Sequence, residues 1–125
     1  MTFPRDKKAI PYYIFLKGEE IFSFGGLYEQ WRNPVTNEME RTFAILTVQA
    51  NSLCSEIHNG GKNPYRMSLI ISRNDESRWI DRSLTKPEIA RFFQPFDASR
   101  MDAYPVSGDF LKKRPGDASI IEPAA

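Results

Sequence analysis

Proline and glycine interrupt this sequence so often that no long regular element is expected. Nine prolines and seven glycines are spread along its 125 residues. Proline removes a backbone N–H and clashes with the preceding turn of a helix, whereas glycine weakens the interior of a strand. The spacing therefore predicts many short helices and strands joined by irregular connections. No internal repeat or low-complexity segment changes that expectation.

Length and composition predict a single folded domain. A chain of this length can bury roughly two-thirds of its unfolded surface, and a hydrophobic content of 41% is that of a folded protein. The net charge of +1 neither demands nor excludes a polyanionic partner, so any basic patch must be local. We interpret residues 1–8 as an arm, 9–107 as the structured region and 108–125 as a tail.

The single cysteine and the hydropathy pattern point to a cytoplasmic protein. One cysteine cannot form an internal disulfide, which favours a reducing compartment. The sequence contains no apolar run of 18 residues, and the first residues, "MTFPRDKKAIP", lack the apolar core of a signal peptide. We therefore expect no membrane partner.

Aromatic and β-branched runs predict the strands. "PYYIFL" (residues 11–16) and "IFSFGGLYEQW" (residues 21–31) flank a short glycine-containing turn and are expected to pair as a hairpin. Gly25 and Gly26, inside the second run, indicate a bulge or a close approach of two backbones. "TFAILTV" (residues 42–48) is apolar nearly throughout, so we expect a central strand buried on both faces. Further strands are expected in "MSLIIS" and "MDAYPVS".

Capping residues predict the helices. Asn51 or Ser52 can cap a short helix that runs to about His58. Thr85 and Glu88 have the spacing of a capping box and open a later helix. "RNDESRWID" is expected to add one or two helical turns. The predicted fold class is α+β: a mostly antiparallel, strongly bent sheet with two or three short helices.

His58 is the only histidine, and the residues alone leave two interpretations of it open. A backbone carbonyl could satisfy the imidazole at the end of the helix. Alternatively, the ring could face a site beyond the glycine-rich turn that follows. No second ligand stands three or four residues away, so we predict no metal site and no cofactor.

Five segments in order resemble the SOS response-associated peptidase (SRAP) family. The resemblance extends over residues 9–107, and no single segment is diagnostic by itself. The matching segments are "KKAIPYYIF", "GEEIFSFGGLYEQW", "TFAILTVQAN", "EIHN" followed by "RM" and an apolar strand, and "AYPVS".

The resemblance implies a role at abasic sites in single-stranded DNA. Family members expose a cysteine at position two, whose amine condenses with the aldehyde of the abasic sugar and whose thiol closes a stable thiazolidine. The same N-terminus is implicated in the self-processing that gave the family its peptidase name. The implied partner of this chain is therefore single-stranded DNA with abasic sites.

Three residues carry over from the family pattern. His58 matches the active-site histidine, Arg66 an arginine near the DNA backbone, and Thr47 a threonine near the DNA at the end of the "ILT" strand. An imidazole can exchange a proton near pH 7, and a guanidinium suits phosphate. The sequence departs from the family pattern at two positions near these residues. Ser68 replaces the family's proline after "RM", and "GGKNPY" lengthens the turn between His58 and Arg66.

Other family residues have no counterpart in the sequence. The chain begins Met1-Thr2 rather than Met-Cys, and neither a "NARxE" nor a "GFYEW" motif precedes "IPYYI". "GLYEQW" is similar to the family's "GFYEW" motif, which contains a catalytic glutamate, but it follows "PYYIF" and matches a later strand of the family. We therefore do not assign the role of that glutamate to Glu29. Cys54 cannot replace an N-terminal cysteine, because the chemistry needs an amine and a thiol on one residue. The sequence thus resembles the C-terminal portion of an SRAP domain.

Two function classes follow from this comparison. In the first, the chain is part of a DNA-damage enzyme and is inactive in crosslinking by itself. In the second, it is a non-catalytic module that binds single-stranded DNA or pairs with another chain. In the first class, strand edges left unpaired predict self-association or a need for the missing N-terminal segment, whereas a monomer that folds cooperatively would favour the second. A degenerate product without function is a third alternative.

Overall fold

The computed structural model describes residues 9–124 and confirms an α+β fold. All of its strand pairs are antiparallel. The strands are β1 (Tyr12–Leu16), β2 (Ser23–Phe24), β3 (Gly26–Arg32), β4 (Met39–Ile45), β5 (Thr47–Gln49), β6 (Arg66–Ser68), β7 (Ile70–Ile71) and β8 (Met101–Pro105), and the α-helices are α1 (Ser52–Ile57), α2 (Glu76–Trp79) and α3 (Lys86–Ala90).

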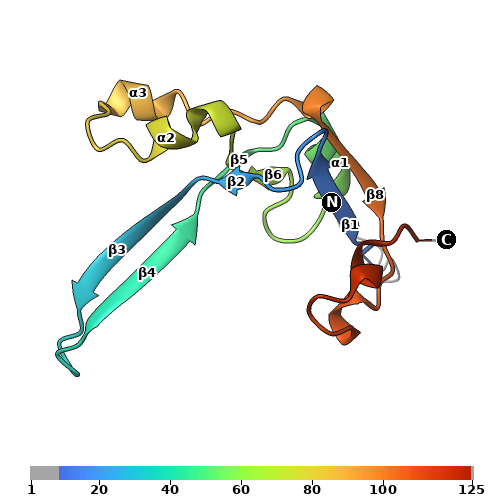
Figure 1. Cartoon of the computed structure of the whole chain (residues 1–125), viewed down its shortest axis with the longest axis horizontal. Helices are drawn as coiled ribbons and strands as arrows, with labels where there is room; N and C mark the ends of the chain where they lie inside the picture. Colours follow the sequence, from blue (N-terminus) through green and yellow to red (C-terminus); the bar gives the residue numbers. More distant parts are fainter. Residues whose placement is uncertain (1–8, 125) are drawn as a thin grey trace.

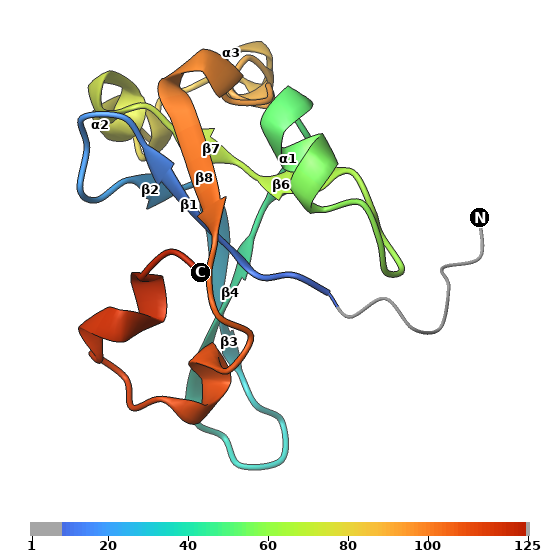
Figure 2. The ribbon, with the colours of Figure 1, turned by 90° about the vertical axis from the view of Figure 1, so that its right-hand side faces the viewer.

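The strands form four two-stranded ladders, β1–β8, β2–β7, β3–β4 and β5–β6. The predicted hairpin between residues 11–16 and 21–31 is therefore wrong. β1 pairs instead with β8, from Tyr12 opposite Pro105 to Leu16 opposite Met101, and Figure 2 shows the two strands side by side. A pair of aromatic rings, Tyr13 and Tyr104, stabilises this non-local pairing with centroids 5.4 Å apart.

Three ladders meet at one point, where Gly25, Leu46 and Leu69 exchange backbone hydrogen bonds. The N–H of Gly25 donates to the carbonyl of Leu69 (2.7 Å), Leu69 N–H donates to Leu46 (2.8 Å), and Leu46 N–H donates to Gly25 (3.0 Å). Each of these residues interrupts a predicted strand, so that residues 21–31, 42–48 and "MSLIIS" each become two short strands. In place of one strongly bent sheet, the structure therefore has four short antiparallel pairs, three of which meet at this junction.

The core surrounds Leu69, whose side chain is fully buried. Phe22, Trp79 and Phe92 pack against the buried cluster from its edge. The cluster consists of Leu16, Val48, Ala50, Cys54, Met67, Leu69, Ile70, Ile71, Phe96 and Met101. Most of these side chains come from β1, β5, α1, β6, β7 and β8, whereas Ala50, Leu69 and Phe96 lie in the connections.

The β3–β4 hairpin projects away from this core (Figure 1). Its seven cross-strand pairs run from Gly26 opposite Ile45 to Arg32 opposite Met39. The prediction of a strand buried on both faces at residues 42–48 is wrong, because Phe43 is 80% exposed and only Val48, beyond the junction, is buried. Among the described residues, β4 has β3 as its sole strand partner, and nothing covers either face of the pair.

The helices begin where their caps predict. Asn51 rather than Ser52 is the N-cap of α1, and its side chain accepts from the N–H of Cys54. Thr85 and Glu88 complete the predicted capping box of α3. The ring of Trp79, at the end of α2, packs edge-on against Phe92 just beyond α3, with centroids 5.3 Å apart.

The two central glycines generate a prediction about stability. A Cβ on Gly25 would lie 2.8 Å from Leu69 Cδ2, and one on Gly26 would lie 2.8 Å from the carbonyl oxygen of Ala44. Because neither neighbour has room to move, Gly25→Ala and Gly26→Ala should each lower the free energy of unfolding by about 1–3 kcal/mol. Denaturant titration measures the loss.

Gly108→Ala is the matched control, because a Cβ there meets nothing within 4 Å. It should leave the free energy of unfolding within about 0.5 kcal/mol of the parent. Equal stability of all three variants would contradict the close approach at the junction.

Candidate functional site

Asn51 holds helix α1 against the body of the chain. Its Oδ1 accepts from the N–H of Cys54 at 2.9 Å, which caps the helix. Its Nδ2 donates to the carbonyl of Phe96 at 2.7 Å and lies 3.3 Å from the sulfur of Met101. One amide side chain thus connects α1 to the segment that leads into β8. The sequence indicated Asn51 or Ser52 as the cap but not this second connection, because its partners lie 45 and 50 positions further along the chain.

His58 is the C-cap of α1, where its N–H donates to the carbonyl of Cys54 at 2.7 Å. Its Nδ1 lies 2.8 Å from the carbonyl oxygen of Arg66. A carbonyl oxygen can only accept, so Nδ1 must carry the proton of this hydrogen bond. In the neutral ring Nε2 is then the acceptor, and none of the residues 9–124 bonds to it. The first interpretation of His58 is confirmed, because a backbone carbonyl holds the ring. The second, a role in a site, stays a prediction, to which the geometry adds that Nε2 has no partner among the described residues.

The turn between His58 and Arg66 is closed at its base. The N–H of Tyr65 donates to the carbonyl of His58 (2.7 Å), and the N–H of Ala50 donates to the carbonyl of Tyr65 (2.9 Å). Gly61 and Tyr65 take positive φ values of 84° and 62°, which reverse the chain within the turn. The residues of "GGKNPY" therefore lie in a turn whose two ends are joined by backbone hydrogen bonds.

Arg66 and Thr47 meet across the β5–β6 ladder. Arg66 Nη2 donates to the carbonyl oxygen of Thr47 at 2.7 Å and to its Oγ1 at 3.1 Å. Arg66 Nε and Nη1 bond to no group within residues 9–124, and the Thr47 hydroxyl keeps its own proton to donate. Both side chains are exposed. The pair thus presents several outward hydrogen-bond donors, an arrangement that suits an anionic oxygen.

All three predicted site residues therefore lie in one connected group. His58 bonds to the backbone of Arg66, and the guanidinium of Arg66 bonds to Thr47. Glu29 does not join them, since it lies exposed on the projecting β3. The proximity of Thr47 to His58 could not be predicted from their spacing in the sequence. It depends on the β5–β6 register, in which Gln49 faces Arg66 and Thr47 faces Ser68.

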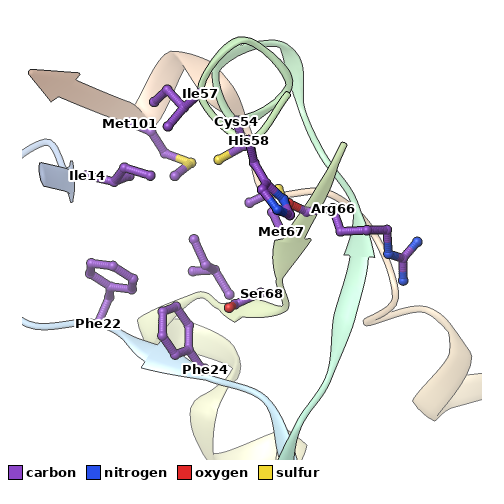
Figure 3. A pocket seen from close by; sticks show the side chains of 11 residues that line it. Ile14, Phe22, Phe24, Cys54, Ile57, His58, Arg66, Met67, Ser68 and Met101 are labelled. Atoms are coloured by element: carbon purple, nitrogen blue, oxygen red, sulfur yellow. The ribbon is translucent and has the colours of Figure 1, made fainter. Parts of the chain in front are cut away.

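A cavity of about 280 Å³ opens beside His58. In Figure 3 the ring lies at its rim, whereas the guanidinium of Arg66 points away from it. The hydroxyl-bearing Ser68, which replaces the family's proline, also borders the cavity. The rest of the lining is apolar and comprises Ile14, Phe22, Phe24, Cys54, Ile57, Met67, Ile70 and Met101.

Cys54 is a packing residue on the inner face of α1. Its side chain is 5% exposed, and burial raises the pKa of its thiol above the usual value. The raised pKa favours the neutral thiol, which is a poor nucleophile. The sequence-based interpretation of Cys54 as a small buried hydrophobe is confirmed.

The described residues contain neither a candidate metal site nor a candidate membrane-spanning helix. No three side chains of the His, Cys, Asp and Glu types lie together there in a way that could hold a metal ion. No helix there has the length and apolar character needed to cross a membrane.

The sequence matches the family model "SOS response associated peptidase (SRAP)" over residues 3–112. The chain is 34% identical over 117 residues to the abasic site processing protein YoqW of Bacillus subtilis, an alignment that covers 93% of this chain and 49% of the relative. It is 33% identical over 102 residues to the abasic site processing protein YobE of the same organism, covering 81% and 43%. The chain thus spans about half the length of the curated relatives it matches.

Two solved structures resemble the fold. A crystal structure of a protein from Bacteroides thetaiotaomicron superposes with a TM-score of 0.89 at 42% identity, over 98% of this chain and 51% of that one. A crystal structure of a protein from Bordetella bronchiseptica superposes with a TM-score of 0.67 at 21% identity, over 80% of this chain and 46% of that one, which shows similarity of fold alone.

The double role of Asn51 predicts graded effects of substitution. Asn51→Ala removes both the cap and the link to Phe96, so it should lower the free energy of unfolding by about 2 kcal/mol, at the upper end for a lost cap. Asn51→Asp keeps the capping oxygen but brings a carboxylate to the Phe96 carbonyl, where it cannot donate. It should therefore also be destabilising. Denaturant titration measures both losses.

Ser52→Ala, at the neighbouring exposed position, is the matched control. It should change the free energy of unfolding by less than about 0.5 kcal/mol. A larger loss for Ser52→Ala than for Asn51→Ala would mean that the cap had been assigned to the wrong residue.

Proposed function

This chain belongs to the SOS response associated peptidase family, and from that premise we propose that it takes part in the processing of abasic sites in single-stranded DNA. Relatives at 33–34% identity are named abasic site processing proteins. The observation that carries the proposal is the connected group of His58, Arg66 and Thr47. In this group an imidazole is linked through Arg66 to hydrogen-bond donors of the kind that suit a phosphate.

We assign the proton transfers of the reaction to His58. In the chemistry that the family resemblance implies, an amine adds to the aldehyde of the ring-opened sugar and the adduct loses water to give an imine. A thiol then adds across the imine, with sulfur bonding to carbon and a proton reaching nitrogen. An imidazole can take the proton released by the amine and deliver it to the departing hydroxyl. Support for this role comes from the Nδ1 hydrogen bond to Arg66, which leaves Nε2 available.

We assign the DNA backbone contact to Arg66 and Thr47. The hydrogen bonds from Nη2 to Thr47 hold the guanidinium in one orientation, so little side-chain freedom is lost when a phosphate binds. Contacts of this kind position a nucleic acid without reading its bases. Such recognition fits an abasic site, where no base is present to be read.

Binding without covalent chemistry is the second candidate function. The chain has one cysteine, which is buried with a raised thiol pKa, so this cysteine cannot serve as the nucleophile. The donors of Arg66 and Thr47 require no nucleophile to hold a phosphate. A gain in affinity for an abasic over an intact oligonucleotide, with no adduct, would favour this candidate.

His58 provides a test of the covalent reaction. In a complete family protein that contains this chain, His58→Ala should slow crosslinking to abasic single-stranded DNA by about 10²-fold, the usual effect of losing a proton-transfer group. A denaturing gel followed over time measures the rate.

Glu56→Ala is the control for His58, because Glu56 is exposed on the same helix and its side chain forms no hydrogen bond within residues 9–124. Its crosslinking rate should equal that of the parent. A His58→Ala protein that crosslinks at the parental rate would remove His58 from the mechanism.

Arg66 provides a test of the backbone contact that needs only this chain. Arg66→Ala should weaken binding to all single-stranded sequences alike and make the salt dependence of log K shallower by about 0.7, the value for one phosphate on a single strand. Fluorescence anisotropy at several salt concentrations measures this slope.

Lys86→Ala removes the same charge from α3, which Figure 1 shows well apart from α1. Its slope should match that of the parent. A slope unchanged by Arg66→Ala, or a loss of affinity confined to one base context, would contradict the phosphate contact.

A further inference from the structure

The two strands β5 and β6 have one buried and one exposed face. Val48 and Met67 are buried, whereas Thr47, Gln49 and Arg66 are exposed. Because successive side chains of a strand point to opposite faces, the three exposed residues share the outer face of the ladder. Neither strand contains an aspartate or a glutamate. Within the ladder, the outer face therefore offers positive charge and hydrogen-bonding groups but no carboxylate that would repel a polyanion.

Gln49 lies directly opposite Arg66 on this outer face. Residues opposed in this way have Cβ atoms only about 4.5–5.5 Å apart. The side chain of Gln49 is exposed, and its amide forms no hydrogen bond to another residue of the range 9–124. The amide offers one acceptor oxygen and two N–H donors. Gln49 is thus a recognition group beside Arg66 that the fold itself does not use.

Tyr65 stands at the end of the same ladder, one residue before Arg66. Its carbonyl accepts from the N–H of Ala50 at 2.9 Å, so it faces the residue after Gln49. Regular alternation along the strand would turn Tyr65 to the buried face, which Met67 occupies. The positive φ of Tyr65, 62°, breaks this alternation. Its ring is 46% exposed and belongs neither to the buried cluster nor to the cavity lining.

The backbone conformation of Tyr65 has an energetic cost. A bulky residue rarely adopts a positive φ, whereas glycine or asparagine does so more easily. Strained residues of this kind concentrate at functional sites, where the strain is part of the function. At Tyr65 the strained backbone keeps an aromatic ring outside the core, where its face is available for stacking.

The direction of the Arg66 side chain determines where a bound strand would run. In Figure 3 its guanidinium points away from the cavity. A strand whose phosphate is bound there follows the outer face of the ladder rather than the cavity. Gln49 lies opposite Arg66, and Tyr65 precedes it with a Cα–Cα separation of about 3.8 Å. An aromatic face together with a free amide is the combination that binds a base turned out of a single strand.

We propose that Gln49 and Tyr65 form the contact site for the base of a nucleotide next to the abasic site. The ring of Tyr65 stacks on this base, and the amide of Gln49 pairs with its edge. The inference rests on the proposed function, because Arg66 must first hold a phosphate of the strand. Every base has a π-face and an edge with a donor and an acceptor, so the site requires a base without selecting one.

Two oligonucleotides that differ only in the neighbouring bases test the proposal with this chain. The first carries a single tetrahydrofuran abasic analogue between intact nucleotides. The second carries the analogue at both neighbouring positions as well, so it keeps every phosphate and loses only the flanking bases. The chain should bind the first about 10-fold more tightly, the effect of losing one stacked base. Fluorescence anisotropy measures the two Kd values.

The ratio of these two Kd values isolates the base contact in variants. Gln49→Ala and Tyr65→Leu should each bring the ratio closer to unity, whereas Tyr65→Phe should preserve it because the ring remains. Leucine keeps the apolar bulk of the side chain, so a role in packing alone would leave the ratio unchanged. The salt dependence of log K should stay that of the parent in all three variants, because none of them removes a charge.

Gln94→Ala and Tyr28→Ala are the matched controls. They remove the same types of side chain from exposed positions outside the β5–β6 ladder. Both should leave the ratio of the Kd values at that of the parent. Control variants that lower the ratio as much as Gln49→Ala and Tyr65→Leu would overturn the assignment.

Three further results separate this inference from the proposed function. A parental ratio of unity, with the salt slope still made shallower by Arg66→Ala, would overturn the base contact and leave the phosphate contact standing. A high parental ratio that neither Gln49→Ala nor Tyr65→Leu lowers would also overturn the base contact at these residues. Failure of the parent to bind either oligonucleotide would overturn both proposals.

Discussion

The backbone hydrogen bonds among Gly25, Leu46 and Leu69 hold this structure together. They close a ring of three bonds in which each residue donates to one neighbour and accepts from the other. The ring brings three chain segments together within van der Waals distance, which is possible because Gly25 has no Cβ to meet the Leu69 side chain. Leu69 is fully buried at this point, so the hydrogen bonds form where water cannot compete for them.

The candidate site depends directly on this junction. Thr47 follows Leu46, and Ser68 precedes Leu69, so the junction sets the register of β5 on β6. That register places Thr47 where the guanidinium of Arg66 can reach it, and the carbonyl of Arg66 in turn holds the His58 ring. A shift of one residue in β6 would turn Arg66 to the opposite face of the ladder. The relative positions of His58, Arg66 and Thr47 therefore depend on the backbone hydrogen bonds of the junction.

The same junction separates two regions of the chain that differ in how much of their apolar surface is buried. On one side lie the candidate site and the buried cluster, and no buried side-chain nitrogen or oxygen of the described residues lacks a hydrogen-bond partner. On the other lies the β3–β4 hairpin, whose side chains have no neighbours across either face. An apolar cavity beside His58 adds to the uncovered surface. One region thus positions the candidate site residues, while the side chains of the other remain exposed.

The sequence by itself determined the features that depend on neighbouring residues. It determined the capping box of Thr85 and Glu88, limited the cap of α1 to Asn51 or Ser52, and indicated a bulge or a close approach at Gly25 and Gly26, because each follows from local stereochemistry. The resemblance of its segments to the SRAP family also predicted that His58, Arg66 and Thr47 belong to one site. Only the tertiary structure decided that β1 pairs with β8, that residues 42–45 are exposed, and that Asn51 reaches Phe96. Strand pairing and burial depend on residues far away in the chain. The sequence of an apolar run by itself does not show whether such residues cover it.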